Sequence, residues 1–182
     1  DSAGLRGFQE EIKSRQFYEP VQPHMDLVLQ RLEKQGPGPL FLYTHFIEPH
    51  APYDRAGTEG TDFERYLGEV ARVDAELGRL RRFLAERGLA GRTTLIVSAD
   101  HGEAFGEHKL NNHANSVFEE LLRVPLFVRI PGAAPRTVKT PVTLMDMGPT
   151  LLDMFGLAAP ATFMGQSLAP ALKKLGYTPP QI

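Results

Sequence analysis

Apolar residues spaced three and four positions apart predict helices in three parts of the chain. The first helix begins near Pro20 and has one apolar face, made of Val21, Met25, Val28 and Leu32. The second begins at a capping box formed by Thr61 and Glu64 and runs to about Arg87. Its apolar stripe consists of Phe63, Tyr66, Leu67, Val70, Val73, Leu77, Leu80 and Leu84. The third helix covers about residues 145–155.

Continuous apolar runs that are too short for helices predict buried strands over residues 40–47, 93–98 and 124–130. These runs alternate with the helices along the chain. Such alternation is typical of an α/β protein with a mostly parallel sheet and helices on its faces. In open sheets of this kind, ligands bind beyond the carboxyl ends of the strands.

Composition narrows the class of protein. The chain has 182 residues, 42% of them hydrophobic, which suits one globular domain with a sizeable core. With 20 Lys and Arg against 22 Asp and Glu, we expect no nucleic-acid partner. The absence of Cys excludes disulfides, zinc–thiolate sites and a Cys nucleophile within these residues.

Five of the six His residues fall where the first two strands end or in the loop that follows, so we expect several to meet at one sheet edge. Asp100 and His101 supply an oxygen and a nitrogen that suit a divalent cation. Gly102 would let the backbone turn and aim both at one ion. The residues alone equally allow a turn in which the Asp caps a helix and the His is merely exposed.

Two loop histidines are candidates for an anion site. His50 lies in a loop that prolines restrict, and His113 follows two Asn residues, so either imidazole could contact an oxyanion. Without further context, a solvated loop histidine is the more common explanation of each. We expect His45 to be a core or wall histidine and Asp74 to be a buried, hydrogen-bonded structural carboxylate.

Several motifs in the order and spacing of a known family occupy residues 38–172. They are the helix pattern Tyr66, Val70, Asp74, Gly78 and Leu80, and the runs FLYTHFIEPHAPY at 41–53, SADHGEAFGEH at 98–108, FEELLRVPL at 118–126, DMGPTLLD at 146–153 and GQSL at 165–168. Through them the chain resembles the C-terminal portion of the sulfatase catalytic domain, in the alkaline phosphatase superfamily. The resemblance implies a three-layer α/β/α sandwich, incomplete because the N-terminal part of the domain is absent. We expect one partial domain, with a leading helical segment over 1–37 and a loose tail over 173–182.

The resemblance also implies roles for individual residues. Asp100 and His101 correspond to ligands of one divalent cation, Ca²⁺ first, with Mg²⁺ and Mn²⁺ as alternatives. His50 corresponds to the histidine that holds the sulfuryl oxygens. His113 stands where many sulfatases have a lysine, and Lys109 is a further candidate for substrate binding. No His follows His113, which favours the one-metal sulfatases and phosphoethanolamine or phosphoglycerol transferases over two-metal members.

The family's nucleophile is a formylglycine made from Cys or Ser in a Cys/Ser-x-Pro-x-Arg motif, which these residues lack. We therefore expect the nucleophile in a missing N-terminal part, which would be the partner of this chain, and expect the chain alone to be inactive. The expected substrate is a sulfate ester, with a phosphate ester as the alternative, and an exposed sheet edge could drive self-association. A non-catalytic module that binds an anion or a partner is a further alternative. The family's bacterial members are mostly exported, which implies a periplasmic or extracellular protein whose membrane anchor, where one exists, lies outside this chain.

Overall fold

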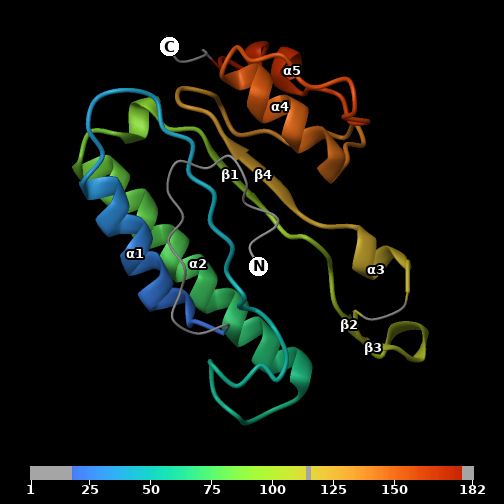
Figure 1. Cartoon of the computed structure of the whole chain (residues 1–182). Coiled ribbons are helices and arrows are strands. Elements are labelled where there is room, and N and C mark those ends of the chain that lie inside the picture. Colours follow the sequence, from blue (N-terminus) through green and yellow to red (C-terminus); the bar gives the residue numbers. More distant parts are fainter. Residues whose placement is uncertain (1–17, 114–115, 178–182) are drawn as a thin grey trace. The chain divides into compact units, whose positions relative to one another are not determined.

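The structure, a computed structural model, describes residues 18–113 and 116–177, which divide into two compact units. The described part of the first unit contains residues 18–37 and 41–83, and that of the second contains 38–40 and 84–177 apart from 114–115 (Figure 1). Among the described residues, no helix has both the length and the apolar character needed to cross a membrane. The expected single-domain organisation stays a prediction.

Two helices build the described part of the first unit, and both were predicted. Helix α1 spans Val21–Glu33 and helix α2 spans Asp62–Glu86. The capping box forms as expected, because the Thr61 backbone N–H donates to Glu64 Oε2 at 2.8 Å and the Glu64 N–H donates to Thr61 Oγ1 at 3.2 Å. The hydrogen bond from the Thr61 backbone lowers the pKa of the Glu64 carboxyl.

Helix α1 lies along α2 (Figure 1). Val21, Met25 and Val28 are buried, and an ion pair of 2.5 Å joins Asp26 to Arg79 of α2. Because Pro20 has no side chain that can cap the helix, a distant residue caps it instead. The buried carboxylate of Glu48 accepts the Val21 N–H at 3.1 Å.

The prediction of a buried strand over 40–47 is wrong. These residues are extended but join no strand ladder within the described chain, and Phe41, Tyr43 and His45 are exposed. The interpretation of His45 as a core histidine is therefore also wrong. Its Nδ1 instead faces the Tyr43 hydroxyl at 3.2 Å on the surface.

The predicted stripe of α2 is buried only in part, since Leu80 and Leu84 are buried whereas Phe63, Leu67 and Val70 are exposed. Asp74 is exposed too, so its expected role as a buried structural carboxylate is wrong. The buried carboxylate of this helix is Glu69.

The second unit is built around two strands that pair antiparallel, β1 (Leu95–Ser98) and β4 (Leu126–Arg129). Leu95 lies opposite Arg129, and Ser98 lies opposite Leu126. The expectation of a mostly parallel sheet therefore fails for the strands described. The described residues between β1 and β4 form no long crossover helix, and without one the chain returns beside β1 in the opposite direction.

Short elements make up the rest of this unit. A 3₁₀ turn, η1 (Ala90–Arg92), precedes β1, and the connection from β1 to β4 contains β2 (Ala104–Phe105), η2 (Glu107–Lys109), β3 (Asn111–Asn112) and α3 (Glu119–Leu122). Strands β2 and β3 form an antiparallel hairpin. After β4 come η3 (Leu144–Asp146), α4 (Met147–Met154) and α5 (Ala169–Lys173). The predicted third helix is thus η3 followed by α4.

The core of the second unit lies between α4, α5 and one face of the β1–β4 pair (Figure 1). Its buried members are Ile130, Met154, Ala169, Leu172 and Tyr177. The Tyr177 hydroxyl donates to the Met154 carbonyl at 2.7 Å, and burial raises the pKa of this phenol. Tyr177 was expected in a loose tail, and that expectation is wrong because its ring completes the core; residues 178–182 lie outside the described chain.

Two of the motifs quoted above are joined by hydrogen bonds. The buried Asp146 carboxylate accepts the Gln166 N–H at 2.8 Å, and the Thr150 hydroxyl accepts the Leu168 N–H at 2.8 Å. The hydrogen bonds from the Thr143 and Gln166 backbones lower the pKa of Asp146. A Cβ at Gly165 would lie 2.0 Å from the Met145 carbonyl oxygen, so the turn approaches η3 this closely only with glycine.

Candidate metal and anion site

Asp100 and His101 follow β1 after one intervening residue, and their side chains lie close together. His101 Nε2 is 3.8 Å from Asp100 Oδ1, and both side chains are exposed, by 41% and 63%. His101 Nδ1 donates to the Gly102 carbonyl at 2.8 Å, because a carbonyl oxygen can only accept. In the neutral ring the lone pair is therefore on Nε2, the nitrogen nearer to the carboxylate.

Gly102 is required for a reason that the sequence did not reveal. Its φ is not in the left-handed region, so the direction of the chain here does not depend on the conformational freedom of glycine. A Cβ at this position would lie 1.9 Å from the Glu120 carbonyl oxygen, and the Gly102 N–H donates to Leu121 O at 2.7 Å. Glycine thus allows the Asp100–His101 segment to pack against the backbone of α3.

The pair fits part of a cation site. Metal–ligand distances of about 2.0–2.6 Å allow two atoms 3.8 Å apart to share one ion. A metal-binding imidazole usually donates its other N–H to an oxygen acceptor, as His101 Nδ1 does here. Among the described residues, no three acidic, His or Cys side chains come together to hold a metal, so further ligands would have to come from elsewhere.

His113 lies beside His101, as the expected convergence requires. The two imidazole rings are stacked with centroids 4.0 Å apart, and His113 Nδ1 lies 3.2 Å from Oε1 of Glu103. The Glu103 side chain is only 6% exposed and fixes the orientation of the ring. Since Nδ1 contacts this carboxylate, an anion would be met by Nε2 of His113. Sequence reasoning missed Glu103, although its place beside the Asp-His-Gly motif is a signal.

His108 and Lys109, two further polar residues of this loop, differ in their surroundings. The His108 ring stacks on Phe118 at 3.9 Å, and its Nδ1 hydrogen-bonds to Glu120 Oε1 at 2.8 Å, which lowers the pKa of Glu120. His108 thus ties the loop to α3. Lys109 is exposed and has a φ of 62°, a left-handed conformation that favours glycine. Its role in substrate binding stays a prediction.

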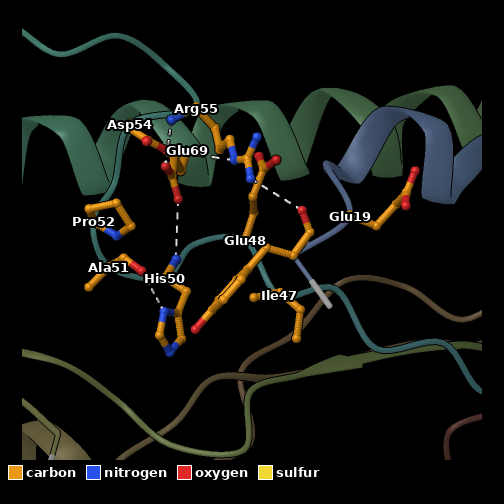
Figure 2. Close-up of a pocket in the computed structure, with 10 residues that line it drawn as sticks. Glu19, Ile47, Glu48, His50, Ala51, Pro52, Asp54, Arg55 and Glu69 are labelled. Carbon is orange, nitrogen blue, oxygen red and sulfur yellow. Dashed lines mark hydrogen bonds and ion pairs between the residues drawn. The ribbon is translucent and has the colours of Figure 1, made fainter. Parts of the chain in front are cut away.

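His50 belongs to the first unit, where it lines a pocket (Figure 2). The residues that line this pocket are Tyr18, Glu19, Ile47, Glu48, His50, Ala51, Pro52, Asp54, Arg55 and Glu69. His50 Nδ1 donates to the Ala51 carbonyl at 2.8 Å, so only the protonated ring could also donate to an anion, from Nε2. The convergence of His50 with the residues of the second unit stays a prediction.

Buried Glu69 holds the loop that carries His50, and sequence reasoning missed it. Its carboxylate accepts the backbone N–H groups of His50 at 3.2 Å and of Arg55 at 3.0 Å. A signal was present, because Glu69 lies three residues after Tyr66 and four before Val73, both on the predicted apolar stripe. An acidic residue at such a position needs hydrogen-bond donors when it is buried.

Comparison with known proteins now decides the family. A family model described as Sulfatase matches residues 4–157. The chain belongs to the sulfatase family. The N-acetylglucosamine-6-O-sulfatase of Bacteroides thetaiotaomicron is 35% identical to it over 116 residues, which cover 63% of this chain and 21% of that protein. The chain thus spans about a fifth of the length of the curated relatives that it matches.

Solved structures give the fold. The phosphonate monoester hydrolase from Silicibacter pomeroyi is 33% identical, with a TM-score of 0.57 over 69% of this chain and 26% of that one. A structure titled Ps i-CgsB in complex with k-i-k-neocarrahexaose is 23% identical, with a TM-score of 0.73 over 94% of this chain and 41% of that one. These likenesses confirm the expected α/β fold of the alkaline phosphatase type, of which this sulfatase chain forms a part.

Proposed function

We propose that the protein carrying this chain hydrolyses sulfuric esters, and that the chain supplies part of its metal and anion site. The observation that carries the proposal is the grouping of Asp100, His101 and His113 after β1. A carboxylate oxygen, an imidazole nitrogen and a second imidazole within one cluster suit a cation and the anionic group that the cation attracts. The sulfatase names of the relatives support the same reaction class.

In this proposal each residue has a distinct task. Asp100 and His101 would hold a divalent cation, of which Ca²⁺, Mg²⁺ and Mn²⁺ are the candidates, and the ion would polarise a sulfuryl oxygen. His113, oriented by Glu103, would as an imidazolium donate from Nε2 to an oxygen of the sulfuryl group. His50, also as an imidazolium, would donate to the same group from its own Nε2. The proposed nucleophile is a formylglycine outside these 182 residues, which contain no Cys.

The test is Asp100→Asn in the natural full-length protein, assayed with an aryl sulfate in the presence of Ca²⁺. We expect kcat/KM to fall by about a hundredfold or more, because the variant removes a charged ligand of the ion. Asp74→Asn is the matched control, since Asp74 is also exposed and lies on α2. Equal activity of the Asp100 variant and the control would end the metal assignment.

A second candidate is the hydrolysis of phosphate or phosphonate esters. The likeness to a phosphonate monoester hydrolase at 33% identity favours it specifically. Comparing kcat/KM for an aryl sulfate and a matched aryl phosphonate distinguishes the two, and we expect the sulfate to be the better substrate. The absence of turnover on both esters in the full-length protein would point to a non-catalytic anion-binding module.

We also propose that the protein acts in the periplasm or outside the cell. The proposal rests on membership of a family whose bacterial members are mostly exported. Cell fractionation with an antibody against this chain tests it, and recovery only with cytoplasmic markers would contradict it.

A further inference from the structure

Glu69 is the most deeply buried acidic residue among those described, with 0% exposure on helix α2. A carboxylate in such a place is costly unless hydrogen-bond donors surround it. Its two oxygens accept the N–H groups of His50 at 3.2 Å and of Arg55 at 3.0 Å. One side chain of the helix therefore holds two points of the same loop.

The loop has further contacts with α1 and α2 close to these two points. The loop comprises residues 49–55, and Glu48 immediately precedes it. The Glu48 carboxylate accepts from Val21 N–H at 3.1 Å and from Arg72 Nε at 3.0 Å. Within the loop, Tyr53 is buried and its ring packs edge-on against Tyr66 of α2 with centroids 5.9 Å apart. These contacts attach the loop to the helices, and Glu69 holds the His50 backbone N–H directly, while the His50 carbonyl accepts the Tyr53 N–H at 3.1 Å within the loop.

The orientation of the His50 ring depends on this backbone. The imidazole lies on the other side of the main chain from Glu69, and its Nδ1 donates to Ala51 O (Figure 2). The ring is therefore fixed relative to residues 50–51, and these are fixed relative to α2 through Glu69. A change at Glu69 would move the imidazole without touching it.

We propose that Glu69 is the positioning residue of His50, a role that rests on the proposed function because His50 is the group expected to contact the sulfuryl oxygens. A simple packing role would be filled better by an apolar side chain, since Glu69 lies on the apolar stripe between Tyr66 and Val73. Unlike an apolar side chain, the carboxylate of Glu69 has two oxygens that can accept the two backbone N–H groups of His50 and Arg55.

The first test measures hydrogen exchange at the His50 and Arg55 amides in the natural full-length protein. In Glu69→Gln only one side-chain oxygen remains, so we expect at least one of the two amides to exchange about ten- to a hundredfold faster. Glu69→Asp, which is shorter, is expected to have the same effect if Glu69→Gln does not fold. Glu86→Gln is the matched control, because Glu86 is exposed on the same helix. Unchanged exchange at both amides in a folded Glu69 variant would overturn the proposal.

The second test is a double-mutant cycle in kcat/KM for an aryl sulfate. We expect Glu69→Gln to lower activity, but to have little further effect in a protein that already carries His50→Ala, because its influence passes through His50. Full additivity of the two changes would mean that Glu69 acts independently of His50 and would overturn the proposal. If the wild-type protein hydrolyses no sulfate ester, the proposed function fails, while the exchange measurement still decides whether Glu69 positions the His50 backbone.

Discussion

At the scale of single residues, close backbone approaches and buried groups set the geometry of the candidate site. Gly102 illustrates this, because the segment that carries Asp100 and His101 meets α3 where no Cβ fits. Glu103 and Glu69 act in the same way through hydrogen bonds, each holding the part of the chain that carries a histidine. The chemistry proposed for the histidines therefore depends on neighbours that do no chemistry themselves.

Gly102→Ala is expected to destabilise the fold by roughly 1–3 kcal/mol, since the new methyl group would lie 1.9 Å from the Glu120 carbonyl oxygen and force the backbone to move. Equilibrium unfolding in urea measures the effect. Gly91→Ala is the control, because a Cβ at Gly91 meets nothing within 4 Å. A Gly102 variant as stable as the control would show that α3 does not pack in this way.

We predict that the free energy of unfolding depends on pH through His24. Burial lowers the pKa of His24, against the opposing effect of Glu19, so the unfolded chain binds the proton more readily than the folded one. The free energy of unfolding is therefore not reduced by His24 above the unfolded pKa of about 6.5. It decreases as the pH falls from there toward the lower folded pKa, because the unfolded chain takes up the proton first. Urea unfolding at several pH values between 7 and 5 should show a weaker loss in His24→Gln. An identical pH profile in the variant would contradict the burial effect.

At the scale of elements, the N-terminus of one helix is capped by neighbouring residues and that of another by a distant residue. Helix α2 begins with its own capping box, so its start is encoded within four residues. Helix α1 has no such signal and takes its cap from Glu48, which is 27 residues from Val21. The local sequence thus specifies where α2 begins, whereas a tertiary contact specifies where α1 begins.

Thr61→Ala is expected to destabilise the fold by about 1 kcal/mol through loss of the cap of α2. The hydrogen bonds of Thr61 lower the pKa of Glu64, so this contribution is present above the usual pKa of a glutamate and is lost as the pH falls through the folded value. The difference between variant and wild type should therefore shrink in acid. Thr58→Ala in the exposed loop before α2 serves as the control, and an equal loss of stability in both variants would argue against capping.

At the scale of the whole molecule, the cation proposed for Asp100 and His101 links stability to metal. A ligand that binds only the folded state at a hundred times its Kd adds about 2.7 kcal/mol to the free energy of unfolding. Treating the full-length protein with a chelator should therefore lower its Tm, and added Ca²⁺ should restore it. Asp100→Asn should remove most of this difference, and an unchanged response in that variant would place any cation elsewhere.

The fold and the site were predictable from sequence where the deciding interactions are local. The helices α1 and α2, the strand β1 and the adjacency of Asp100 and His101 follow from residues one to four positions apart. The strand predicted over 40–47 failed because an apolar run indicates burial only when a partner covers it, and Phe41 and Tyr43 are exposed. The expectation of a buried Asp74 failed for the same reason, since the stripe of α2 does not reveal which of its positions another segment covers.

The sequence by itself determined the family, the two long helices and the residue types available to a cation and an anion, because motif order, periodicity and side-chain chemistry need no knowledge of distant contacts. Only the tertiary structure decided the antiparallel direction of β1 and β4, the stacking of His113 on His101 and the tie from Glu69 to the His50 loop. Each of these joins residues at least ten positions apart in the chain. Whether such groups meet depends on how the intervening chain folds, which no local pattern records.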